Sequence, residues 1–450
     1  MPGLSHTLEI ARRAMMAQQA VMSVIGNNIA NAGTAGYSRQ IARLEAERPL
    51  SFGQIQFGDG VVLRDVERRR DLFLDQQVHN EMGSAAWWEA RAERLGGIEA
   101  ILGEPSDEGL GAALDAFWSS WSELSAGPED RALRSTVREA GRNLALRLQQ
   151  LDAGIASAAA GLDAEIDAAV PEVNRRLALI ADLNRRIVAA EQGGAHANDL
   201  RDQRDLIVDE LSQWADFRFG EREDGSLLVR LDGVTLVDRD EARQLSTGTR
   251  TLADGGRASA VTLDGAALGI SGGRLGSLLE LREQTVPSLQ QSLDLLARDL
   301  AAQVNALHRA GPSGADFFAG TSAADVRLSA EVEADLGAIN VSTSGLSGEN
   351  DVALAIAQLQ TAHVIDGATA SAGEYWSAFV GRLGTMTQEA GFQQTNATLA
   401  GEALSARRES IKGVSLDEET ANMVQAQQAF LAAARLFEVT ADLFDALLEV

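Results

Sequence analysis

Three aspartates about one helical turn apart are a group of side chains whose spacing could support cation binding. Asp199, Asp202 and Asp205 lie in the segment DLRDQRD, and carboxylates at this spacing could hold a divalent cation. They could instead be helix-start acids that pair with the neighbouring Arg201 and Arg204. The second interpretation is favoured because it explains the acids without a further ligand.

The remaining residues offer no constellation for catalysis. The five histidines are scattered, without HExxH spacing, and the sequence has no cysteine for a thiolate nucleophile or a zinc–thiolate site. The segment GLGAAL at 109–114 lacks the last glycine and the preceding strand of a dinucleotide-binding loop. We therefore expect no enzyme activity, no metal and no cofactor. An enzyme would need an active site in residues 215–274, with Asp224 or Asp232 as its acids.

The composition limits the classes of partner. The 450 residues carry a formal net charge of −26, from 65 acidic and 39 basic residues. Such a surface repels nucleic acid and anionic lipid, so neither nucleic acid nor membrane is expected as a partner. No apolar run approaches the roughly 20 residues that cross a bilayer. The N-terminal stretch after Arg13 is broken by Gln18 and Gln19, which argues against a cleaved secretory signal.

The strongest periodic signal lies at the two ends of the chain, where apolar residues recur every seven positions. The N-terminal residues of this kind are Leu8, Met15, Met22 and Ile29, with Ile25 in an interleaved series, and the C-terminal ones are Leu416, Met423, Phe430, Phe437 and Phe444, with Leu448 in its interleaved series. Each end is therefore predicted to be a helix with one narrow apolar seam.

The terminal helices should be antiparallel neighbours, because both should emerge from one end of a helical bundle. Arg12 and Arg13 would then lie near the acids of the C-terminal helix, Glu438, Asp442 and Asp445. Fixing roughly 60 residues costs on the order of 60 kcal/mol of backbone entropy, whereas each large buried seam residue returns only about 1.5–3 kcal/mol. We expect the ends to fray in the free monomer and to order when neighbouring subunits bury their other faces.

The predicted fold is mainly α with a small inserted β domain. Two breaks are specific: Pro171 should kink or split the long helix that starts near residue 131, and Asn198 should cap the helix over 199–214. Four parts are predicted: a terminal antiparallel coiled-coil domain (1–36 plus 413–450), a helical-bundle core (37–214, 275–309 and 350–412) with a β-hairpin near the N-terminus at 38–66, a small β domain (215–274), and an irregular subdomain (310–349).

Two terminal segments carry a resemblance to a known family. NNIANAGTAGYSRQ (27–40) resembles the N-terminal signature of bacterial flagellar rod, hook and hook-associated proteins, and the segment 413–448, with its core QQAFLAAAR, resembles their C-terminal one. SRQ directly after Gly36-Tyr37, the helical run over 71–213, ANDLRDQRDLIVDELS (197–212) and FFAGTSAAD (317–325) are similar to the hook-associated protein 1 family. The small β insertion departs from longer members, so an outer domain is expected to be reduced or missing.

The resemblance implies a structural subunit at the hook–filament junction. Such a subunit is exported through the flagellar type III apparatus and lies outside the cell, at the distal end of the hook. Its implied partners are copies of itself in a ring or short helical segment, the hook protein, the next hook-associated protein toward the filament, and an export chaperone on the C-terminal helix. The alternatives are another axial component (hook or rod), which a β-dominated 71–213 would indicate, and more remotely a secreted enzyme on a flagellar scaffold.

The segment after the first helix is the candidate assembly motif. Local chemistry alone favours an ordinary helix-ending loop, because asparagines and glycines are common there. The resemblance favours a contact between subunits instead. The motif residues are Asn27, Asn28, Ile29, Ala30, Asn31, Thr34, Gly36 and Tyr37. The apolar seam residues of the terminal helices are expected to pack both within the chain and against other subunits.

Overall fold

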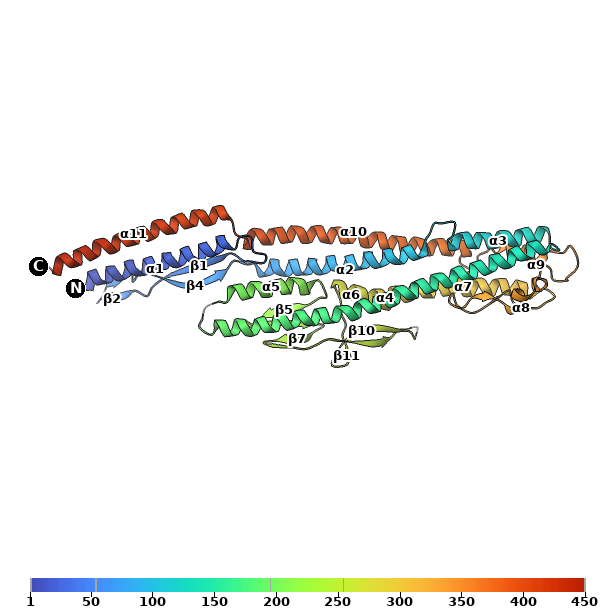
Figure 1. The fold of residues 1–450 in the computed structure, drawn as a ribbon, viewed down its shortest axis with the longest axis horizontal. Coiled ribbons are helices and arrows are strands. Elements are labelled where there is room, and N and C mark those ends of the chain that lie inside the picture. Colours follow the sequence, from blue (N-terminus) through green and yellow to red (C-terminus); the bar gives the residue numbers. More distant parts are fainter. Residues whose placement is uncertain (1, 53–54, 195, 254, 449–450) are drawn as a thin grey trace. The chain divides into compact units, whose positions relative to one another are not determined.

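The computed structural model describes residues 2–52, 55–194, 196–253 and 255–448 (Figure 1). Its helices are α1 (Pro2–Ala30), α2 (Leu72–Leu102), α3 (Leu110–Ala126), α4 (Arg131–Glu191), α5 (Asn198–Ser212), α6 (Gly273–Glu280), a π-helical turn (Leu281–Thr285), α7 (Val286–His308), α8 (Ala330–Ala334), a 3₁₀ turn (Leu336–Ala338), α9 (Asp351–Gln358), α10 (Ala372–Lys412) and α11 (Leu416–Leu448). No described helix is long and apolar enough to cross a membrane.

The strands are short and all pair in antiparallel fashion. They are β1 (Gln40–Ala46), β2 (Leu50–Phe52), β3 (Ile55–Phe57), β4 (Val61–Arg68), β5 (Arg218–Glu221), β6 (Leu227–Leu231), β7 (Val234–Asp238), β8 (Glu241–Ala242), β9 (Ser246–Thr251), β10 (Arg257–Leu263), β11 (Ala266–Ala267), β12 (Phe318–Ala319) and β13 (Arg327–Leu328). The long helices and few strands agree with the predicted mainly α class.

The chain forms two compact units, each assembled from separate stretches of sequence. The first unit holds Met1–Gly83, Glu172–Gln244 and Ala397–Val450, and the second holds Ser84–Pro171 and Leu245–Asn396. The β region predicted as one domain supplies a sheet to each unit: β5-β6-β7-β8 to the first and β11-β10-β9 to the second. The four-part division of the sequence otherwise stays a prediction.

In the first unit, the two terminal helices lie side by side and antiparallel, so the N- and C-termini are at the same end (Figure 1). A hairpin of β1 and β4 packs on α1, with Gln40 opposite Arg68 at its base, and the smaller β2–β3 pair continues it. The predicted helix pair and hairpin are confirmed. The hairpin adds a packing surface for α1 that the seam argument did not include.

The second unit is built around an aromatic cluster. Phe117 and Trp121 of α3 pack against Phe317 and Phe318, with ring centroids 5.3–5.8 Å apart across the two segments. The start of α3 is held by Glu104, whose carboxylate accepts hydrogen bonds from the Gly111 amide and from the Trp376 indole, both at 2.9 Å. These contacts use large, fully buried side chains, which contribute most to core stability.

The structure differs from two local predictions about α4 and α5. Pro171 does not split α4, which continues to Glu191 as one helix of 61 residues, and a kink at this proline stays a prediction. Buried Val170 and Val173 lie on both sides of the proline, and such packing offsets its cost of about 3 kcal/mol. Asn198 does not cap α5 either: it is the first residue of that helix, and its amide donates to the Val66 carbonyl at 2.8 Å.

Arg12 and Arg13 also have other partners than predicted. Arg12 pairs with Glu9 on its own helix, and Arg13 pairs with Asp59 at the β3–β4 turn, with an N–O distance of 2.6 Å. The hairpin therefore supplies the acid that the sequence argument assigned to α11.

Candidate functional site

The candidate assembly motif begins with a completely buried asparagine at the end of α1. Asn28 is 1% exposed, and its amide donates to the Gln40 carbonyl at 2.9 Å and to the Glu419 carboxylate at 3.0 Å. Its carbonyl oxygen accepts from the Gln40 amide and from the Tyr37 hydroxyl, both at 2.9 Å. One side chain thus joins α1, β1 and α11.

The other polar residues of the motif hold the turn itself together. Asn27 donates to the Tyr37 hydroxyl at 3.2 Å, Asn31 donates to the Asn27 side chain at 2.9 Å, and Thr34 donates to Asn31 at 3.2 Å. Burial, reinforced by three nearby carboxylates, raises the pKa of Tyr37 to about 12. The hydroxyl therefore stays protonated and able to donate at physiological pH.

Gly36 is required by its backbone and by its neighbour. Its φ of +79° lies in the left-handed region, and an added Cβ would come within 2.5 Å of the Leu206 side chain on α5. By contrast, Ile29, Ala30 and Thr34 are exposed. The motif therefore uses its asparagines and tyrosine inside the subunit, and only its exposed residues are available to another molecule.

The three aspartates of α5 bind the backbone and side chains that follow the motif. They do not form a cation site, and they do not pair with Arg201 and Arg204. The contacts are Gln40 Nε2 to Asp199 (3.2 Å), the Ser38 amide to Asp202 (2.9 Å), Arg68 to Asp202 (2.7 Å) and to Asp205 (2.8 Å), and Arg70 to Asp205 (3.3 Å). Within the described ranges, no three metal-ligating side chains converge. These partners are far away in sequence, so helical spacing could not identify them.

The two arginines between these aspartates point elsewhere. Arg201 pairs with Glu191 at 2.6 Å and with Glu221 of β5. Arg204 is fully buried and donates to the Asn184 side chain at 2.9 Å and to the Gly225 carbonyl at 2.8 Å. Burial lowers its pKa to about 10. The α5 helix therefore joins the motif on one face and α4 with the four-stranded sheet on the other.

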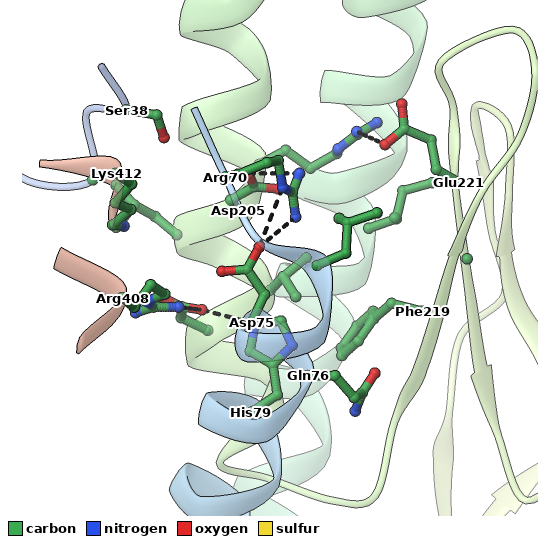
Figure 2. A pocket seen from close by; sticks show the side chains of 18 residues that line it. Ser38, Arg70, Asp75, Gln76, His79, Asp205, Phe219, Glu221, Arg408 and Lys412 are labelled. Atoms are coloured by element: carbon green, nitrogen blue, oxygen red, sulfur yellow. Dashed lines mark hydrogen bonds and ion pairs between the residues drawn. The ribbon is translucent and has the colours of Figure 1, made fainter. Parts of the chain in front are cut away.

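A cavity of about 310 Å³ lies beside α5 in the first unit (Figure 2). Asp209 there receives two hydrogen bonds from Arg408, at 2.9 and 2.8 Å, and contacts His79 Nε2 at 2.9 Å. Burial alone would raise the pKa of Asp209, but these bonds hold it below its ordinary value. Figure 2 shows Ser38 and His79 at opposite ends of the cavity, so they do not form a nucleophile–base pair.

The deepest contacts of α11 are made by small residues and one acid, not by the predicted large ones. Glu419, Ala426, Ala433 and Thr440, at seven-residue intervals, are 1–8% exposed. Small side chains let two helices approach closely, and the large residues then flank the contact. Of the predicted seam residues, Ile25 is buried; Leu8, Met15, Met22, Met423, Phe430 and Phe444 are half-buried; Ile29, Leu416 and Phe437 are exposed; and the Leu448 side chain lies outside the described residues.

A second set of apolar residues covers α11 and is exposed. These residues, named here the α11 stripe, are Val424, Leu431, Leu436, Val439, Leu443 and Leu447, each 44–61% exposed. Exposed apolar side chains in this number on one helix are typical of a surface that contacts other molecules. These residues lie outside both seven-residue series of the C-terminal segment, although the sequence has more apolar positions in α11 than one seam needs.

Family models match three parts of the chain. Residues 95–318 match the model described as flagellar hook-associated protein FlgK helical domain. Residues 8–37 match flagella basal body rod protein, and residues 410–450 match flagellar basal body rod FlgEFG protein C-terminal. The two terminal matches cover the motif and α11.

Three relatives of this chain carry the same name. The chain is 31% identical to flagellar hook-associated protein 1 of Bacillus subtilis (strain 168), over 97% of this chain and 96% of that protein. It is 30% identical to the protein of that name from Salmonella typhimurium and 29% to the one from Escherichia coli (strain K12), over 70% of this chain. The chain spans about 60% of the length of these two longer relatives.

A solved structure supports the fold. "The structure of the flagellar hook junction protein FlgK from Burkholderia pseudomallei" aligns with a TM-score of 0.64 and 15% sequence identity, over 75% of this chain and all of that one. This likeness concerns the fold alone. The Bacillus subtilis relative, which matches nearly end to end, leads to one conclusion about the family. The chain belongs to the flagellar hook-associated protein 1 family and is a structural protein of the bacterial flagellum.

Proposed function

We propose that this protein is a structural subunit of the extracellular flagellum that joins the hook to the filament. The observation that carries the proposal is the apolar surface of α11: a terminal helix that already packs against α1 still exposes the six residues of the α11 stripe, together with Leu416 and Phe437. Such a surface suits a protein completed by its neighbours more than one that acts alone.

Identical copies are the proposed occupants of the α11 stripe. Each large apolar side chain that a neighbour buries contributes about 1.5–3 kcal/mol, so the six stripe residues supply on the order of 10 kcal/mol per subunit. Copies related by one repeated rotation would form a ring or short helical segment. Three exposed residues of the motif are proposed as a second contact of the same interface. Ile29 and Ala30 lie at the C-terminal end of α1, and Thr34 lies in the turn that follows it.

The proposed partners beyond self-contacts are the hook protein, the next hook-associated protein toward the filament, and an export chaperone. The chaperone would cover α11 before export, because an uncovered apolar helix promotes aggregation inside the cell. Export through the flagellar type III apparatus is part of the proposal, and the family membership of the chain supports it.

The alternatives are less well supported. A hook protein would be mostly β over residues 71–213, whereas this region consists of α2, α3, α4 and α5. We propose that the protein is not an enzyme. In the β region, the Asp224 carboxylate is occupied by hydrogen bonds from the Ser226 amide and hydroxyl, at 2.9 and 2.5 Å. In the cavity of the first unit, Asp209 is similarly engaged.

Removal of residues 416–450 tests the proposal. The truncated protein should stay soluble and helical, because both units keep their other elements, but cells should carry hooks without filaments and shed flagellin into the medium. Electron micrographs and a swimming assay measure this outcome. A matched pair of substitutions refines it: Leu431→Asp places a charge in the α11 stripe, whereas Arg435→Asp changes an exposed polar position of the same helix. Normal swimming after truncation would overturn the proposal.

A further inference from the structure

The packing of α1 against α11 does not by itself define how far one helix is shifted along the other. The buried line of α11 repeats every seven residues, and two of its four members are alanines. A shift by seven residues in one direction, roughly 10 Å along the axis, therefore places Ala426 where Ala433 was, and one alanine replaces another. Shape alone discriminates weakly between such registers.

One buried polar cluster breaks this repetition. Glu419 is 1% exposed, and its two carboxylate oxygens contact Arg39 at 2.6 Å and the Asn28 amide at 3.0 Å. Two hydrogen bonds of 2.8 Å hold the backbone of Arg39 in place. Its amide donates to the Lys412 carbonyl, and its carbonyl accepts from the Arg69 amide. The position of the guanidinium donor that Glu419 must meet is therefore set by the hairpin and by the end of α10.

We propose that Asn28, Arg39 and Glu419 form a register lock that fixes the axial position of α11 against α1. If α11 moved seven residues one way, Ala426 would face Arg39, and a buried guanidinium would lose its buried acid. If it moved the other way, Glu419 would lie level with Val21 and lose its cation. A buried charge without a partner carries a large penalty, and one buried polar position is known to select register in paired helices.

The neighbouring Glu418 provides a matched control. It contacts the same Arg39 at 2.6 Å, but its side chain is 62% exposed, against 2% for that of Glu419. An exposed ion pair contributes little, whereas a buried one strongly disfavours the arrangement that breaks it. Only Glu419 should therefore select register, although both residues bind one arginine.

The inference deepens the proposed function, since the register decides where along the subunit the α11 stripe is presented. Copies with shifted α11 helices would offer their stripes about 10 Å out of step with their motifs. The lock consists of contacts within one subunit. Fraying of the ends in the free monomer stays a prediction, and cross-linking of the isolated protein tests the lock independently of filament attachment.

Engineered cysteine pairs can report the register, because the natural sequence has no cysteine. Asn28 contacts Glu419, and the two helices are antiparallel. Val21, seven residues before Asn28, therefore lies level with Ala426, seven residues after Glu419, and both line one groove. The pair Val21→Cys with Ala426→Cys reports the observed register. Val21→Cys with Ala433→Cys, and Ala14→Cys with Ala426→Cys, report a shift of seven residues in either direction.

In the otherwise unchanged full-length chain, only the first pair should form a disulfide in good yield under mild oxidation. Adding Glu419→Ala should raise the yield of at least one shifted pair about tenfold or more, whereas Glu418→Ala should change it less than twofold. Glu419→Gln keeps the hydrogen bond to Asn28 but loses the charge, so it should fall between them. It also serves as the test variant if circular dichroism shows that Glu419→Ala does not fold.

Equal yields of native and shifted pairs in the unchanged chain would overturn the lock, and so would equal effects of the Glu418 and Glu419 substitutions. Either result leaves the proposed junction role intact, because that role is judged by filament attachment. Conversely, normal swimming without residues 416–450 would remove the junction role and leave the cross-linking result standing.

Discussion

Different kinds of contact stabilise the interiors of the two units of this protein. The second unit has an aromatic core of Phe117, Trp121, Phe317 and Phe318, all fully or almost fully buried. In the first unit, α1 and α11 meet through alanines and a threonine, and the position is set by buried polar groups around Asn28 and Arg68. Aromatic packing stabilises a unit without any partner, whereas small seams and ion pairs specify geometry and leave apolar surface for other molecules.

The largest effect on stability is expected in the aromatic core. Phe317→Ala removes a ring that is 0% exposed and should lower the free energy of unfolding by about 3–5 kcal/mol, because it loses apolar burial and leaves a cavity. Phe392→Ala is the control, since that ring is 64% exposed, and should change stability by about 0.5 kcal/mol or less. Urea unfolding measures both. Similar losses for the two variants would contradict the comparison.

A smaller effect is expected at the turn of the first unit. Gly36→Ala puts a Cβ against Leu206 in a left-handed backbone conformation and should cost about 1–3 kcal/mol. Gly33→Ala changes a glycine three residues before Gly36 in the same turn. An added Cβ there meets no atom within 4 Å, and the backbone is not in the left-handed region, so the substitution should be nearly neutral. Thermal unfolding of the two variants compares them. A neutral Gly36→Ala would mean that the motif does not depend on this close approach.

The smallest effect is a pH dependence in the second unit. His308 is fully buried; one ring nitrogen contacts the Ala315 carbonyl at 2.7 Å, and the other accepts from the Asn340 amide at 3.0 Å, so the folded state needs the neutral ring. Burial lowers its pKa below the ordinary value near 6.5. The unfolded chain therefore binds the proton first, and the stabilisation is complete above about pH 6.5 and declines below it.

This decline amounts to at most about 1.4 kcal/mol per pH unit for one proton. It can be measured as the difference between the unfolding free energies of the unchanged protein and His308→Gln from pH 7.5 to 5. The difference should shrink as the pH falls. A constant difference would show that the Asn340 hydrogen bond does not depend on the neutral imidazole.

The comparison of the units also explains what the sequence could reveal. The hairpin and the terminal helix pair follow from local patterns in the sequence, so they were predictable. The phase of the α1–α11 contact was not, because alanines give a weak apolar signal although they pack closest. The partners of Asp199, Asp202 and Asp205 could not be inferred, since Arg68 and Arg70 are more than 120 residues away in the chain.

The contacts within the candidate site could not be predicted either, because the fold brings their residues together. The motif residues could be named from their resemblance to a family, but only the fold shows that Asn28 and Tyr37 bond to each other. Whether the exposed Ile29, Ala30 and Thr34 touch a second subunit stays a prediction.

The hydrogen bond between Asn28 and Glu419 joins residues 391 positions apart. A chain synthesised from its N-terminus cannot close this bond until almost its entire length has left the ribosome, and closing so long a loop is slow and entropically unfavourable. The terminal helices are therefore the last elements that the polypeptide can bring together during biosynthesis. Until then, α1 lacks the helix that it packs against in the folded protein.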